Sequence, residues 1–191
     1  MLERRRVVEA LLAEREDALV VSGLGSPTYD VHAAGDVDAN YYLWGAMGSA
    51  ALVGLGIALA QPDRRVIVIT GDGEQLMAFG SLATIAIAKP ANLEILVLDN
   101  EHYGETGMQE SHTARDLDFA AVAASCGFAA TRTVKDEAGL AELVAASPQK
   151  RSGPLFAVIK IATDSPPRSL PPRDAVFIKN RFRAHLGLAP N

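Results

Sequence analysis

Cysteine is almost absent from the sequence, which has only Cys126 among its 191 residues. A single cysteine excludes an internal disulfide and any metal cluster that needs several thiolates. Cys126 lies within an apolar run, residues 122–128, so we expect it to be a buried structural residue.

Positive charge is also scarce, because the formal net charge is −5 and the isoelectric point is near 5.4. This balance argues against a surface that binds nucleic acid or an anionic membrane. It does not exclude an anionic cofactor, since backbone N–H groups and one metal ion can supply local positive charge.

Long apolar runs are lacking as well. The longest stretch, residues 46–60, is too short and too rich in glycine to span a bilayer. Residues 1–16 are charged throughout, and their apolar positions have the spacing of an amphipathic helix rather than of a signal peptide. We therefore expect a cytoplasmic protein. With 49% hydrophobic residues and no linker in its middle, the chain is expected to form one domain over residues 1–191.

Short β-rich runs alternate with longer helical patterns along the chain. The predicted strands are residues 18–22, 66–70, 94–98, 129–134 and 155–161, and the predicted helices are residues 46–60, 74–88, 118–126 and 136–146. Two of these strands are nearly continuous in Val, Ile and Leu, as in parallel sheets buried on both faces. The alternation predicts an α/β fold, with an open, mostly parallel sheet and helices on both faces.

The end of the sequence has a different composition. Residues 164–174 contain four prolines, Pro166, Pro167, Pro171 and Pro172. Proline restricts the backbone and removes an N–H donor, so this part should be an extended crossing segment. An amphipathic piece follows at residues 175–186, and we expect residues 164–191 to form an extended tail with a terminal helix.

Three loops rich in glycine and oxygen-bearing side chains follow predicted strands, at residues 23–28, 71–74 and 100–107. In open α/β sheets, ligands bind beyond the carboxyl ends of the strands. In the second loop, glycines permit a tight turn and a phosphate can approach free N–H groups. Asp72 would repel that phosphate unless a divalent cation lay between them, and Mg²⁺ prefers such oxygen ligands. Asn100, at the end of the next strand, can ligate the cation without adding charge.

The spacing of these residues is similar to a known motif. Gly71-Asp72-Gly73, followed one helix and one strand later by Asp99-Asn100, resembles the thiamine diphosphate (ThDP) motif of the ThDP-dependent enzymes. The resemblance implies that Asp72, Asn100 and the main-chain carbonyl of His102 hold Mg²⁺ against the diphosphate. The family motif often ends in Asn-Asn, whereas this chain has Asp99-Asn100. A lone Gly-Asp-Gly could be an ordinary strand–helix turn, and the pairing with Asn100 makes the resemblance specific.

The resemblance also assigns residues around the rest of the cofactor. It implies that the carbonyl of Gly45 binds the 4′-amino group and that Met47 supports the bent cofactor, although Met47 alone would be interpreted as a core residue. Tyr103, Glu105 and Thr106 are candidates for substrate or diphosphate contact, or else belong to a solvated loop. The predicted cofactor-binding residues are Ser26, Gly45, Met47, Gly71, Asp72, Gly73, Glu74, Asn100, Tyr103, Gly104 and Glu105.

One part of the family's active site has no counterpart in the sequence. ThDP enzymes use a glutamate at N1′ of the aminopyrimidine, supplied by a separate pyrimidine-binding domain, and only about one helix precedes the first strand here. Residues 71–86 and 98–109 are most similar to the sulfopyruvate and phosphonopyruvate decarboxylases of the family. The resemblance therefore implies a ThDP- and Mg²⁺-binding subunit of a heteromeric 2-oxoacid decarboxylase, and we assign no catalytic residue to this chain.

A separately encoded pyrimidine-binding subunit, in a hetero-oligomer, is the partner that this interpretation requires. Two alternatives stay open. One is a Mg²⁺-dependent diphosphate-binding module without catalysis. The other is a different ThDP enzyme subunit, such as the β chain of a 2-oxoacid:ferredoxin oxidoreductase, and the single cysteine argues against it.

Overall fold

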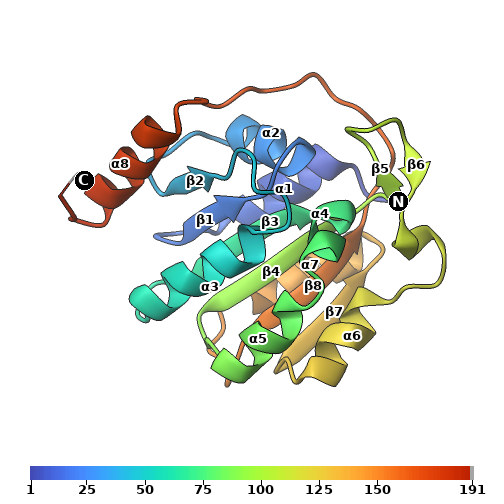
Figure 1. The fold of residues 1–191 in the computed structure, drawn as a ribbon. Helices are drawn as coiled ribbons and strands as arrows, with labels where there is room; N and C mark the ends of the chain where they lie inside the picture. The colour runs from blue at the N-terminus through green and yellow to red at the C-terminus, as the bar shows by residue number, and fades with distance from the viewer. Residues whose placement is uncertain (190–191) are drawn as a thin grey trace.

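A single six-stranded sheet forms the centre of the computed structural model, which describes residues 1–189 (Figure 1). The strand order is β2-β1-β3-β4-β8-β7, and every neighbouring pair is parallel. The strands are β1 (Leu19–Ser22), β2 (Asn40–Tyr42), β3 (Val66–Gly71), β4 (Leu93–Asp99), β7 (Ala130–Val134) and β8 (Leu155–Lys160). The predicted open parallel sheet is confirmed.

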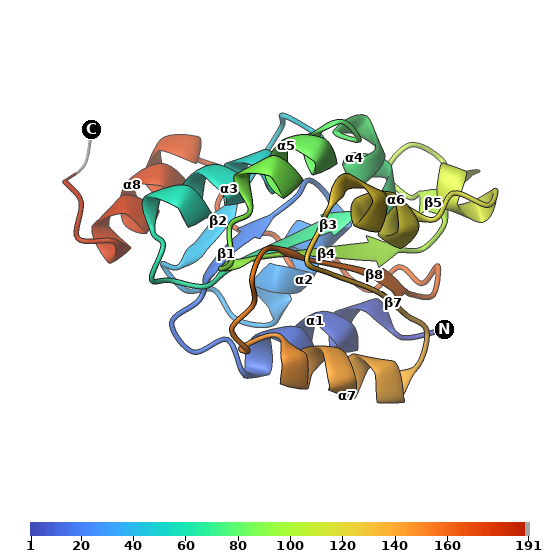
Figure 2. The ribbon, with the colours of Figure 1, turned by 90° about the horizontal axis from the view of Figure 1, so that it is seen from below.

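Helices cover both faces of this sheet (Figure 2). One face carries α1 (Arg4–Ala13), α2 (Ser26–Ala33) and α7 (Glu137–Ala146), and the other carries α3 (Ala50–Ala60), α4 (Asp72–Met77), α5 (Ser81–Ala88) and α6 (Phe119–Cys126). Successive strand side chains point to opposite faces, so Val68 belongs to one core cluster and Ile69 to the other. Burial of each such side chain stabilises the fold by about 1.5–3 kcal/mol.

Several element boundaries differ from the sequence prediction. The predicted helix at residues 74–88 is two helices, α4 and α5, interrupted at residues 78–80. The helix predicted from residue 46 begins only at Ala50, because Gly45, Ala46 and Gly48 have φ angles of 71°, 46° and 93°, outside the right-handed helical region.

Helix α2 and strand β2 were not predicted from the sequence, and neither were three short elements, β5 (His102–Tyr103), β6 (Gln109–Glu110) and the 3₁₀ turn η1 (His112–Ala114). Helix α2 begins at Ser26, inside the expected loop, with Pro27 in its first turn, where a missing N–H costs no hydrogen bond. Strand β2 is a three-residue edge strand, too short to show a pattern. Cys126 is half-buried rather than fully buried, and packs against the core from the end of α6.

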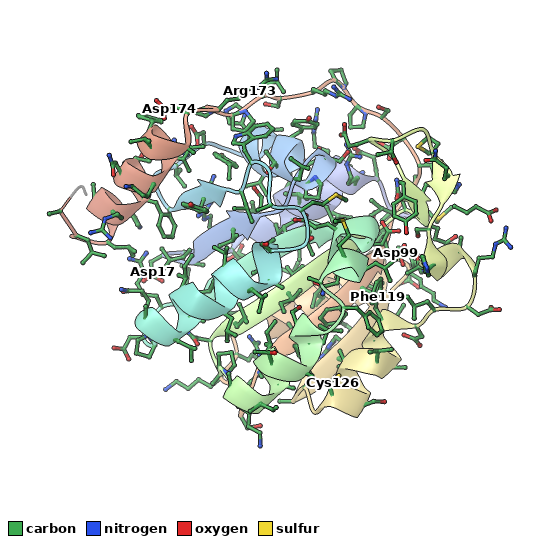
Figure 3. All side chains as sticks on the ribbon, in the orientation of Figure 1. Asp17, Asp99, Phe119, Cys126, Arg173 and Asp174 are labelled. Carbon is green, nitrogen blue, oxygen red and sulfur yellow. The ribbon has the colours of Figure 1, made fainter. Side chains whose placement is uncertain are left out.

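The tail crosses the molecule in an extended conformation and ends in helix α8 (Ala175–His185) beside β2 (Figure 1). Trp44 Nε1 donates a hydrogen bond to the carbonyl of Pro172 (2.8 Å), and Arg173 lies over the Trp44 ring. Arg173 and Asp174 mark the point where the tail enters α8 (Figure 3), and Asp174 accepts hydrogen bonds from the first N–H groups of the helix. The predicted tail extends to residues 190 and 191, which lie outside the described residues.

Membrane insertion through a helix was not expected from the sequence. Within residues 1–189, every helix is either too short or too polar to cross a bilayer.

Candidate functional site

A cavity lies at the carboxyl ends of β1, β3 and β4, where the three predicted loops converge. Its wall is formed by Arg4, Leu24, Ser26, Pro27, Met47, Gly71, Asp72, Gly73, Glu74, Leu98, Asn100, His102, Tyr103, Gly104, Glu105, Thr106 and Ile161. The structure therefore brings together all the predicted cofactor and metal residues except Gly45, which lies in the adjacent loop and is not part of this wall. Parallel strands place these loops together because their carboxyl ends share one edge of the sheet.

Asp72 is the first residue of α4, and its side chain is buried. The hydroxyl group of Ser111 donates a hydrogen bond to its Oδ2 atom, and Thr113 Oγ1 lies 3.4 Å from the same oxygen. Burial, with a smaller contribution from the nearby Asp99, raises the pKa of the Asp72 carboxyl group to about 6, although the Ser111 hydrogen bond opposes the shift. The charged form of this carboxylate therefore lacks a compensating cation in the protein itself.

Asp99 ends β4 at the same edge (Figure 3), and it is also buried. It accepts a hydrogen bond of 2.7 Å from Thr113 Oγ1, and Lys160 Nζ lies 2.8 Å from its Oδ2 atom. Lys160 is also 2.7 Å from Glu101 Oε1, and these two acidic partners help to raise the pKa of the lysine. Asp99, which stands where the family motif often has Asn, is thus neutralised locally by Lys160.

The other two predicted ligands lie in the loop that follows β4. Asn100 Oδ1 accepts a hydrogen bond from the N–H of His102 (3.1 Å), and the carbonyl of His102 accepts one from Gly104 (3.1 Å). Each oxygen retains a second lone pair. Glu101, between them, has a φ angle of 63° and turns the loop sharply.

A carboxylate, an amide and a carbonyl are oxygen donors that fit Mg²⁺ together with phosphate oxygens. In the described part of the chain, no three His, Cys, Asp or Glu side chains form a cluster able to hold a metal. Gly73 also makes room in the wall, since a Cβ atom there would lie 2.7 Å from the Tyr103 ring.

Glu74 connects three loops beneath the cavity. It is buried and accepts hydrogen bonds from Thr70 Oγ1 (2.9 Å) and from the N–H of Gly48 (3.2 Å). A Cβ atom on Gly23 would lie 1.7 Å from Glu74 Oε2, so only glycine fits at this position of the first loop. Burial raises the pKa of the Glu74 carboxyl group. Glu74 therefore organises the cavity wall, in addition to lining it as predicted.

Met47 has 40% of its surface exposed and lines the cavity, which rules out the interpretation as a core residue. Ser111, Thr113, Lys160 and Arg4 are polar residues of the site that the sequence analysis missed. Arg4 and Lys160 lie far from the two motifs in sequence, whereas Ser111 and Thr113 come soon after residue 109. None of the four belongs to a motif, so only the fold reveals them.

The parallel sheet and the oxygen-lined cavity at its carboxyl edge define a cofactor-binding α/β domain. The family of thiamine pyrophosphate enzymes, in the form of their C-terminal TPP binding domain, matches residues 27–160. The chain belongs to this family, and thiamine pyrophosphate is another name for ThDP.

Two kinds of relative are similar to this chain. The sulfopyruvate decarboxylase subunit beta of Methanothermobacter thermautotrophicus is 37% identical over 182 residues, which cover 95% of this chain and 94% of that protein. The phosphonopyruvate decarboxylase of Streptomyces viridochromogenes is 48% identical over 128 residues, covering 66% of this chain but only 32% of that protein. The chain thus spans about a third of the length of the second relative and nearly all of the first.

Among solved structures, a Mycobacterium smegmatis protein described as a thiamin diphosphate-dependent enzyme superposes with a TM-score of 0.67. The match covers 84% of this chain and 32% of that protein at 24% sequence identity. It supports the α/β fold.

Proposed function

We propose that the chain is the ThDP- and Mg²⁺-binding subunit of a heteromeric 2-oxoacid decarboxylase. The observation that carries the proposal is the position of Asp72 and Asn100, which follow adjacent parallel strands and line one cavity. The similarity to a sulfopyruvate decarboxylase subunit beta over nearly the whole chain supports it.

In this proposal, each residue of the chain has a binding or positioning role. Asp72, Asn100 and the carbonyl of His102 hold Mg²⁺, and Gly71 and Gly73 let the diphosphate approach the backbone. When bound, the cofactor supplies a thiazolium group that accepts the electron pair released as CO₂ leaves.

The loop around Gly45 and Met47 supports the other half of the cofactor. Gly45, Ala46 and Gly48 have positive φ angles, which fix the shape of this loop. The N–H of Gly48 donates a hydrogen bond to Glu74, and this bond connects the loop to the start of α4. The cofactor is thereby held in a reactive geometry, which is catalysis by positioning.

The proposed partner supplies the glutamate for N1′ of the aminopyrimidine. Apolar side chains are exposed at this end of the site: Met47, in the cavity wall, and Met77, at the end of α4. Met77 contacts the loop that carries Met47, since a Cβ atom on Gly48 would lie 3.1 Å from it. Exposed apolar surface of this kind supports a partner that covers the cavity.

The proposal is tested by measuring CO₂ release from 2-oxoacids. The purified chain is assayed alone and after mixing with a separately produced pyrimidine-domain subunit, with ThDP and Mg²⁺ present. Activity only in the mixture supports a split enzyme, whereas activity of the chain alone contradicts it. No activity in either sample, with ThDP still bound, would favour the non-catalytic binding module.

A further inference from the structure

Arg4 brings a positive charge to the cavity from the opposite face of the sheet. It lies in the first turn of α1, is only 6% exposed, and forms part of the cavity wall. Two residues before Arg4, Leu2 forms a parallel bridge to Ile161, and Ala162 donates a hydrogen bond to the Leu2 carbonyl (2.8 Å). This pairing fixes the start of α1 beside the end of β8, at the carboxyl edge of the sheet.

The charge of Arg4 is only partly compensated. Its Nε atom is paired with Asp30, a fully buried carboxylate that Arg5 Nε also approaches, at 3.3 Å. Two guanidinium groups on one carboxylate leave one net positive charge. Arg5 directs its Nη2 atom outward to the carbonyl of Pro167 (2.7 Å). No hydrogen bond to the two Nη atoms of Arg4 is found among the described residues, so these atoms are available to a ligand in the cavity.

The rest of the cavity wall needs such a charge if an anion binds there. Asp72, Glu74 and Glu105 are acidic, and Arg4 is the one Lys or Arg among the described residues of the wall. A charged group taken out of water requires a compensating partner. A single Mg²⁺ cannot neutralise both Asp72 and a diphosphate, which together carry more than two negative charges.

We infer that Arg4 binds the terminal phosphate of the cofactor through its Nη atoms. The planar guanidinium fork matches the oxygens of a phosphoryl group and binds them in a bidentate manner. Arg4 shares the cavity with Asp72 and Asn100, the proposed metal ligands, and these hold the diphosphate end. The matched family region begins at residue 27, so Arg4 lies outside it. The inference rests on the proposed function.

The same chemistry would suit a sulfonate or phosphonate group of a substrate, and the experiment separates the two sources. Binding of ThDP, of pyrophosphate (both with Mg²⁺) and of methanesulfonate is measured by calorimetry for the wild-type chain, Arg4→Gln and Arg5→Gln. Arg5→Gln is the matched control, because it also removes a charge beside Asp30 but leaves the cavity wall intact. We expect Arg4→Gln to bind ThDP and pyrophosphate roughly tenfold to a hundredfold more weakly, and Arg5→Gln to stay within about twofold of wild type.

Unchanged affinity of Arg4→Gln for ThDP and pyrophosphate would overturn the inference while leaving the proposed function intact. So would a loss confined to methanesulfonate, which would assign Arg4 to the substrate. A wild-type chain that binds neither ThDP nor pyrophosphate also contradicts it. If the wild-type chain does not bind ThDP but binds pyrophosphate in a way that depends on Arg4, the result supports the anion site and contradicts the proposed function.

Loss of Arg4 leaves Asp30 buried with one partner fewer, and the single variant could fail to fold. The double variant Arg4→Gln/Asp30→Asn removes both buried charges, so neither is left without its partner and the chain can still fold for the binding measurement. It should show the same loss of diphosphate affinity as Arg4→Gln, against Asp30→Asn alone as its control.

Discussion

At the scale of single residues, Asp72 combines a proposed role in metal binding with a cost to the stability of the metal-free chain. Its carboxyl group keeps its proton in the folded chain up to about pH 6, above its ordinary pKa of 3.8. The folded state therefore binds more protons than the unfolded state between these two values, and the stability of the metal-free chain falls as the pH rises through that interval.

The variant Asp72→Asn should remove this cost. At pH 8 without metal, we expect the free energy of unfolding to rise by about 1–3 kcal/mol, because a neutral amide replaces a buried charge. At pH 5, inside the interval between the two pKa values, the gain should be only about half as large, and it should vanish below about pH 3.8, where the carboxyl group is protonated in both states. Urea denaturation with a chelator at both pH values measures the difference, and an equal effect at pH 5 and pH 8 would contradict the assignment.

Glu74 should behave differently, because its hydrogen bonds hold neighbouring loops. Glu74→Ala leaves the Thr70 hydroxyl and the Gly48 N–H without their acceptor, and we expect it to destabilise the chain by about 1–3 kcal/mol. Glu74→Gln keeps an acceptor oxygen in place and should cost clearly less. Thermal unfolding of both variants provides the comparison, and an equal loss in both would mean that the charge, not the hydrogen bonding, matters.

The residues that the sequence could predict are those next to buried strands. Asp72 and Asn100 follow strands rich in Val, Ile and Leu, and parallel pairing of these strands places both residues in one cavity. Ser111 reaches Asp72 from further along the segment after β4, and Arg4 reaches the cavity from the other face of the sheet. Because no local pattern encodes such long-range contacts, they could not be predicted.

At the scale of elements, apolar composition predicted strands better than it predicted helix ends. β4 is buried at every position, and the continuous apolar run revealed it. The break between α4 and α5 and the late start of α3 depend on backbone conformations near glycines, such as Gly48, that the apolar pattern does not show. Short elements such as β2 contain too few residues for any periodicity.

The segment after β6 (Gln109–Glu110), which continues into the 3₁₀ turn η1 (His112–Ala114), should control metal affinity. Ser111→Ala removes the hydroxyl group that orients Asp72, and we expect Mg²⁺-dependent ThDP binding to weaken by about tenfold or more. Ser125→Ala is the control, because that hydroxyl group only bonds the Ala121 carbonyl on the exposed side of α6. Calorimetric titration at saturating Mg²⁺ should restore most of the affinity, and a loss that Mg²⁺ does not relieve would argue against this role.

Helix α8 should be anchored to the sheet mainly by Phe182. This side chain is buried, belongs to the core cluster and packs edge-on against Tyr41, with ring centroids 5.4 Å apart. We expect Phe182→Ala to lower the free energy of unfolding by about 3 kcal/mol through loss of burial and cavity formation. Phe177→Ala, on the same helix but half-exposed, should change it far less, and similar losses in the two denaturation curves would show that α8 is not docked as described.

At the scale of the whole molecule, the carboxyl edge of one sheet gathers groups from both faces. α4 and the loop after β4 bring the proposed metal ligands, the loop before α3 brings Met47, and α1 brings Arg4. We propose that this edge holds one end of the cofactor and that the acid–base group for the other end comes from a partner. The fold class was predictable from the alternation of strands and helices in the sequence. The full set of residues in the cavity wall could be identified only from the way these elements pack together.

The central claim is that this chain binds the diphosphate of ThDP through a divalent cation held by Asp72 and Asn100. Its most direct test is a calorimetric titration of ThDP with and without Mg²⁺, for the wild-type chain, Asp72→Ala and Asn100→Ala. We predict binding that requires Mg²⁺, that is abolished by Asp72→Ala, and that is weakened less by Asn100→Ala because a neutral ligand is lost. Binding of ThDP to Asp72→Ala with wild-type affinity would contradict the claim.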